Sequence, residues 1–197
     1  MMNSAVPWST GGLVLVAPGG LAAPALGPAL AFLAALLTLR HLDCTCKPAD
    51  DPALRLSALA AEPPGWLLPL GLDPGQELAG SGCWADALAA WRQPVVLLVP
   101  ATAFDLPAGA ARAYDALLQQ ARVPVLGLVQ IGGAAAPPRG DGLPWLGWLE
   151  AQVADAELVD QCHQALRRQL LRRWQALSVA RPDQQRSDPA GAVDLPG

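Results

Sequence analysis

Four short stretches of continuous hydrophobic residues occur along this chain, one near its start and three between residues 94 and 149. Each is too short for a helix and is bounded by proline, glycine or polar residues, which is typical of a strand buried on both faces. The predicted strands are residues 13–17, 94–100, 123–130 and 143–149. Between them, apolar residues recur at three- and four-residue steps, which predicts helices over 28–39, 84–91, 108–121 and 150–178.

The order of these elements predicts an α/β fold. Residues 94–130 read as strand, helix and strand, and such a unit favours parallel strands joined by a right-handed crossover. We therefore expect a three-layer domain over residues 1–180, with a mostly parallel sheet between helices. Residues 181–197 are polar and contain proline and glycine, so we expect a disordered tail.

The apolar stretch 13–39 raises the question of a membrane span. Pro18, Pro24 and Pro28, together with several glycines, interrupt it, and the longest uninterrupted helical piece is 28–39. That piece is about 18 Å long, short of the roughly 30 Å hydrocarbon core. We interpret 13–17 as a strand, 18–27 as a loop and 28–39 as a buried helix. Membrane association through 13–39 remains an alternative hypothesis.

The charge of the chain excludes nucleic acid as a main partner. The formal net charge is −4 and the sequence pI is about 5.0, whereas phosphate contacts require a basic surface. The arginines between Arg167 and Arg173 fall late in the last helix, where positive charge is favoured. The four cysteines lack the spacing of metal or redox pairs and are interpreted as thiols.

Several segments follow one another in a distinctive order: Lys47-Pro48, the run from Glu62 through Gly65-Trp66 to Pro69-Leu70, and the helix with Ala85-Asp86 before the strand at 94–100. The order continues through 123–130 and 143–149. In this order the segments resemble the dethiobiotin synthetase family of the P-loop fold. In that family a strand ends at the glutamate, and ATP and Mg²⁺ drive carboxylation of a diamine and closure of a ureido ring.

The resemblance also implies a site. Gly19, Gly20 and Gly27 would approach the phosphates, Gln130 would face the base, and Lys47 would contact the carbamate and γ-phosphate. Asp51 and Glu62 would hold Mg²⁺ through carboxylate oxygens. Yet residues 18–28 contain no lysine, serine or threonine, although a P-loop needs a lysine on the phosphates and a hydroxyl on Mg²⁺.

We therefore expect a cytoplasmic dethiobiotin-synthetase-like protein with degenerate nucleotide binding, homodimeric as its relatives are. If it is active, its cofactors would be ATP and Mg²⁺. A non-catalytic scaffold or interaction module that kept the fold is the alternative. Neither reading involves nucleic acid or a membrane.

Overall fold

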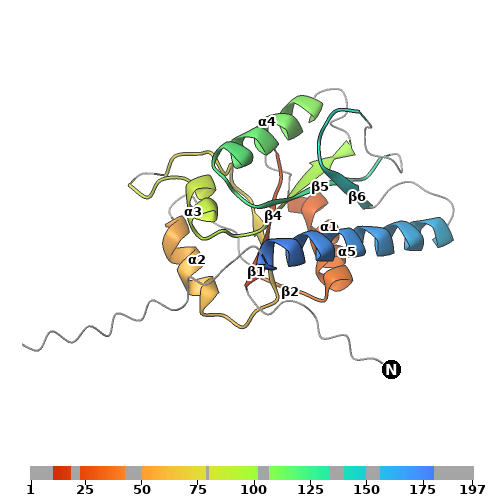
Figure 1. The fold of residues 1–197 in the computed structure, drawn as a ribbon, viewed down its shortest axis with the longest axis horizontal. Coiled ribbons are helices and arrows are strands. Elements are labelled where there is room, and N and C mark those ends of the chain that lie inside the picture. Colours follow the sequence, from red (N-terminus) through yellow and green to blue (C-terminus); the bar gives the residue numbers. More distant parts are fainter. Residues whose placement is uncertain are drawn as a thin grey trace, which may run out of the picture.

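A six-stranded parallel sheet forms the centre of the molecule (Figure 1). The computed structural model describes residues 11–18, 23–42, 50–78, 80–101, 107–133, 140–149 and 156–179. The strands are β1 (Gly12–Val16), β2 (Arg40–His41), β3 (Trp66–Leu70), β4 (Val95–Pro100), β5 (Val125–Ile131) and β6 (Trp145–Leu149). Their order across the sheet is β2-β3-β1-β4-β5-β6, so the predicted parallel sheet is confirmed.

Five helices cover the two faces of the sheet and complete the predicted three layers. They are α1 (Ala23–Leu37), α2 (Pro52–Ala60), α3 (Trp84–Ala90), α4 (Pro107–Gln120) and α5 (Ala156–Val179). One hydrophobic core joins α1 and α5 to the sheet, and the other joins α2, α3 and α4 to the opposite face (Figure 1). The strands supply both cores because successive side chains point to opposite faces.

The described strand and helix of the apolar stretch 13–39 contribute to the core of this domain. Leu13 and Leu15 of β1 pack with Leu33 and Leu37 of α1, all nearly inaccessible to solvent. Over the part of the chain that the structure describes, no helix is both long and apolar enough to cross a membrane.

Helix α1 begins earlier than the sequence predicts. The residues from Ala23 onward, which were expected in a loop over 18–27, belong to the helix, and Gly27 and Pro28 lie inside it. Pro24 falls in the first turn, where the missing N–H of a proline removes no intrahelical bond.

The expectation that a strand ends at Glu62 is wrong. The residues before it form α2, which begins at an N-cap: Oδ1 of Asp51 accepts hydrogen bonds from the N–H groups of Ala53 at 2.8 Å and Leu54 at 3.1 Å. Pro52 occupies the first helical position, where its fixed φ is already helical. The strand comes after Glu62, at β3.

Three helices end in the same unusual way. Thr38 after α1, Arg92 after α3 and Arg122 after α4 have φ values of 56°, 48° and 64°. This left-handed conformation is the usual end of a helix, but glycine normally adopts it because a Cβ atom is penalised there. All three residues lie in connections that lead from a helix into a strand, at the amino end of the sheet.

Candidate functional site

The connections of β1 and β4 identify the place where a parallel sheet of this order binds ligands. From β1 the chain leaves through α1 toward the β2 edge, and from β4 it leaves through α4 toward the β6 edge. Ligands of open parallel sheets bind in the crevice at the carboxyl ends of two such neighbouring strands. The candidate site is therefore formed by the connections after β1 and β4, with the end of β5 beside them.

The connection between β1 and α1 is short and apolar. It comprises the six residues from Ala17 to Ala22, because β1 ends at Val16 and α1 begins at Ala23. It contains no lysine, serine or threonine. Gly19 and Gly20 lie outside the described residues, as does Lys47 in the connection between β2 and α2.

Gly27 does not lie in this connection. It occupies the second turn of α1, is exposed, and has no atom within 4 Å of the position that a Cβ would take. Nothing at this position requires the absence of a side chain, so the structure does not place Gly27 in a phosphate-binding loop.

Gln130 lies at the end of β5 with a fully buried side chain. Its Nε2 donates a hydrogen bond of 2.8 Å to the carbonyl of Gly132, so the amide holds the turn that follows the strand. A Cβ at Gly133 would overlap the side chain of Ala101 at the end of β4. Gly133, which sequence reasoning did not single out, therefore lets this turn pack closely on β4; its φ of 72° also favours glycine.

The two carboxylates predicted to share Mg²⁺ lie at opposite ends of α2. Asp51 caps the start of the helix, whereas Glu62 follows its end and forms an exposed ion pair of 3.1 Å with Arg40. The nine residues of α2 extend about 14 Å at the usual rise per residue. A single metal ion cannot be held by both side chains in this arrangement.

Acidic residues dominate the carboxyl end of the sheet. Along the described chain, the connections that lead from strands into helices and the first turns of those helices contain Asp50, Asp51, Asp73, Glu77, Asp86 and Glu157. Arg55 is the basic residue in these described segments, and Arg112 lies further along α4. The excess of negative charge opposes the binding of a phosphate group.

The cysteine nearest to these acids is a poor nucleophile. Sγ of Cys83 lies 3.3 Å from Oδ2 of Asp86, and burial together with this carboxylate raises the pKa of the thiol. A raised pKa keeps Cys83 protonated at neutral pH, and the thiolate is the reactive form. Cys83 and Cys162 are both free, and Cys44 and Cys46 lie outside the described residues.

A metal centre is also missing from the described part of the molecule. Over those residues, no group of three or more histidine, cysteine, aspartate or glutamate side chains is placed to hold an ion.

The carboxyl end of the sheet, where a nucleotide would bind, thus contains the buried side-chain amide of Gln130 and two glycines with positive φ, Gly132 and Gly133. The described charged residues around them are mostly acidic. Comparison of the chain with protein-family models, with curated proteins and with solved structures gave no match.

Proposed function

We propose that this chain is a dethiobiotin-synthetase-like α/β domain that has lost nucleotide chemistry and acts as a binding domain for another protein. The observation that carries the proposal is the connection between β1 and α1. It has six residues and lacks the lysine and the hydroxyl group that a triphosphate and its Mg²⁺ require. Pro18 also removes one backbone donor from it.

The charge distribution supports the same conclusion. A nucleoside triphosphate carries several negative charges, and the carboxyl end of the sheet already has an excess of carboxylates. Lys47 is the remaining basic candidate of the resemblance, in the connection between β2 and α2. This one lysine would have to offset the repulsion from the carboxylates at this end of the sheet. It would also have to replace the lysine and the hydroxyl group that the connection between β1 and α1 lacks.

The residues that would complete an active site have other partners. Asp51 accepts two N–H groups of α2, Glu62 pairs with Arg40, and Gln130 bonds to the turn after β5. Binding Mg²⁺ through Asp51 would expose the first turn of α2, because the cap satisfies two of its N–H groups. The geometry therefore favours a scaffold over an ATP-dependent ligase.

Calorimetric titration of the full chain with Mg-ATP tests the proposal. Each lost charge-assisted contact weakens binding by about tenfold or more, so we expect a dissociation constant in the millimolar range or weaker. A low-micromolar constant that Lys47→Ala abolishes, and that the control Arg168→Gln in α5 leaves unchanged, would restore the ATP- and Mg²⁺-dependent enzyme.

From the same resemblance we propose that the protein is a cytoplasmic homodimer. Light scattering on the purified protein at several concentrations measures the mass directly. A mass of one chain at every concentration would remove this part of the proposal.

A further inference from the structure

Two of the left-handed helix ends are arginines, and they occupy equivalent positions in two successive connections from a helix to a strand. Arg92 follows α3 and precedes β4 by three residues, and Arg122 follows α4 and precedes β5 by three residues. Val95 and Val125, the first residues of these strands, pair directly in the sheet. Because the strands are parallel and about 4.8 Å apart, both arginines lie at the same end of the sheet.

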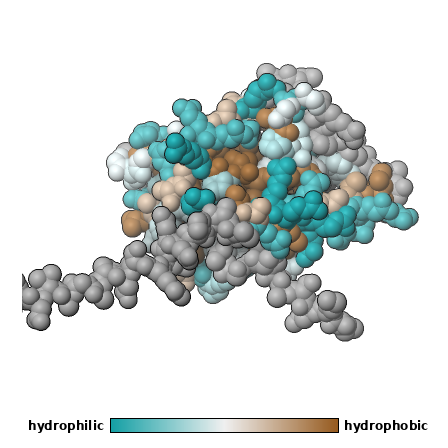
Figure 2. Space-filling model, viewed as in Figure 1, coloured by the Kyte–Doolittle hydropathy of each residue, from teal (hydrophilic) through white to brown (hydrophobic). Residues whose placement is uncertain are grey.

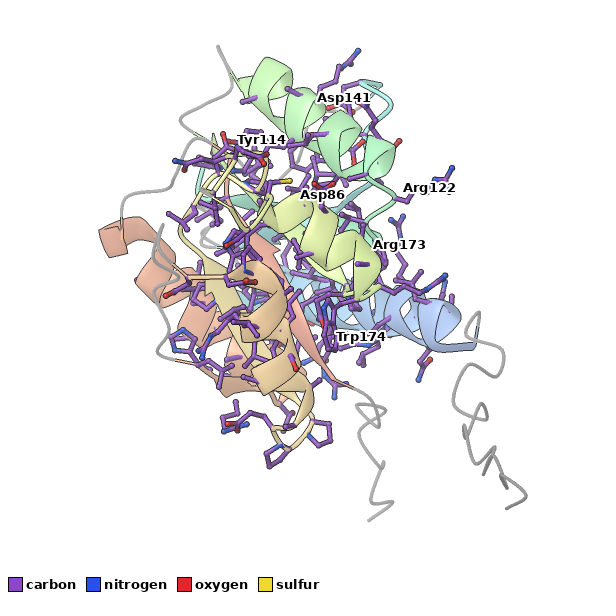
Figure 3. All side chains as sticks on the ribbon, turned by 90° about the vertical axis from the view of Figure 1, so that its left-hand side faces the viewer. Asp86, Tyr114, Arg122, Asp141, Arg173 and Trp174 are labelled. Carbon is purple, nitrogen blue, oxygen red and sulfur yellow. The ribbon has the colours of Figure 1, made fainter. Side chains whose placement is uncertain are left out.

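Helix α5 brings two further arginines to this end. Nη1 of Arg173 donates a hydrogen bond of 2.6 Å to the carbonyl of Leu126, near the start of β5. Figure 3 shows Arg173 and Arg122 toward the same side of the molecule, where α4 ends. Arg172 precedes Arg173 in α5 and is exposed.

Hydrophobic side chains are exposed among these arginines. The indole of Trp91, next to Arg92, is 39% exposed, and Pro94, Pro124 and Val125 are half-buried. The brown area between α4 and α5 in Figure 2 belongs to residues of higher hydropathy than tryptophan and proline. We call the set formed by Trp91, Arg92, Pro94, Arg122, Pro124 and Arg172 the amino-edge surface. An apolar centre with a polar rim, enriched in tryptophan and arginine, is typical of protein interfaces.

The charge of the amino-edge surface restricts what can bind to it. Residues 91–94, 121–124 and 170–179 contribute four arginines and no acidic residue to this end, whereas Glu62 and Asp141 lie in the connections that lead into β3 and β6. Two copies of the chain that met through this surface would bring like charges together, which disfavours a dimer here. The net charge of −4 and the pI of about 5.0 disfavour nucleic acid. An acidic protein segment complements both the charge and the apolar centre.

The conformation of Arg92 and Arg122 gives this surface an unusual feature. Each arginine occupies a position where a left-handed residue with a Cβ costs about 1–2 kcal/mol and where glycine is the ordinary choice. Thr38 has the same conformation without adding charge, so the conformation alone does not indicate binding; the added positive charge at two neighbouring positions is what points to a docking role.

We propose that the amino-edge surface is a docking site for an acidic, partly hydrophobic segment of another protein. Carboxylates of that segment pair with Arg92, Arg122 and Arg172, and its apolar side chains contact Trp91. The inference deepens the proposed function by naming the chemistry of the partner, and it places the partner at the end of the sheet opposite the candidate nucleotide site.

The test uses the full chain and a short fluorescein-labelled peptide of Asp, Glu and Leu, with anisotropy as the readout. We expect saturable binding that weakens as salt is added. The double variant Arg92→Gly/Arg122→Gly should bind about tenfold more weakly, the loss expected for two exposed ion pairs. It should also be at least as stable as the parent protein, because glycine relieves the backbone at both positions. A folded variant with weakened binding separates lost docking from lost structure.

Two controls decide the result. Arg55→Gln, on α2 at the other end of the sheet, should bind the peptide as the parent does. A peptide with Lys in place of Asp and Glu should not bind. Absent binding, unchanged affinity of the double variant, or equal binding of the Lys peptide would each overturn the proposal, as would a DNA duplex or a second copy held through these arginines. The Mg-ATP titration is a separate readout, so the two proposals can fail independently.

Discussion

Replacing Thr38 with glycine is expected to stabilise the protein. Thr38 follows α1 with a φ of 56°. The N–H of Thr38 and that of Leu39 bond back to the carbonyls of Ala35 and Ala34, at 3.2 and 2.8 Å. A β-branched residue rarely adopts this conformation, because its Cβ substituents crowd the backbone. The side chain is exposed, so its removal sacrifices little buried contact.

The magnitude follows from two opposing terms. Relief of the left-handed conformation is worth about 1–2 kcal/mol. The greater conformational freedom of glycine in the unfolded chain reduces this gain in stability by about 0.4–1 kcal/mol. The net gain is therefore about 1 kcal/mol, which raises Tm by roughly 2–4 °C in a chain of this size.

Urea unfolding and thermal scans of Thr38→Gly, with Thr38→Ala as the matched control, measure this gain. Alanine also removes the hydroxyl and methyl groups but keeps the Cβ, so most of the backbone penalty remains. If Thr38→Gly is no more stable than Thr38→Ala, the left-handed conformation carries no measurable penalty at this position.

Three further changes test the packing of the two faces. Gly12→Ala should destabilise by about 3 kcal/mol, because a Cβ there would overlap the buried ring of Trp66, and Trp66→Leu should recover part of the loss; a double-mutant cycle in urea measures both. Arg167→Ala should cost about 1–2 kcal/mol, since its Nε donates a 2.9 Å bond to a carbonyl of the last turn of α1, whereas exposed Arg168→Ala should be nearly neutral. Burial lowers the pKa of His163 below 6.5. The free energy of unfolding that the neutral imidazole contributes is therefore complete above pH 6.5 and is lost as the pH falls below that value. His163→Leu should flatten this decline, which unfolding experiments between about pH 5 and 8 measure.

The strands predicted from continuous apolar runs are those buried between two helical layers, where both faces of a strand must be hydrophobic. The sequence signal fails at β3 because Pro69 argues against a strand. Over the residues that the structure describes, β2 pairs with Trp66 and Leu67, which leaves Pro69 outside this ladder. Helix α2 was missed for a related reason. Its nine residues are too few for a clear period, and the resemblance suggested a strand at Glu62.

The candidate site is harder to predict than the fold because its partners are far apart in sequence. A pattern assigns a residue to a face of the sheet but does not identify the group that it meets. Nothing in the run of arginines from Arg167 to Arg173 indicates that two of them bond to carbonyls of α1 and β5. Likewise, the side chain of Gln93 donates to the carbonyl of Gly12 across 81 positions of sequence.

The three left-handed helix ends allow strain and binding to be separated within one molecule. Thr38, Arg92 and Arg122 share the same backbone conformation and the same end of the sheet, but two of them add positive charge to the amino-edge surface. If strain alone distinguished these positions, glycine would have the same effect at all three. A docking role instead predicts that Thr38→Gly stabilises the chain and leaves binding of the acidic peptide unchanged, whereas Arg92→Gly/Arg122→Gly stabilises it and weakens that binding. Equal peptide affinities in both variants would show that the two arginines end their helices without contributing to a docking site.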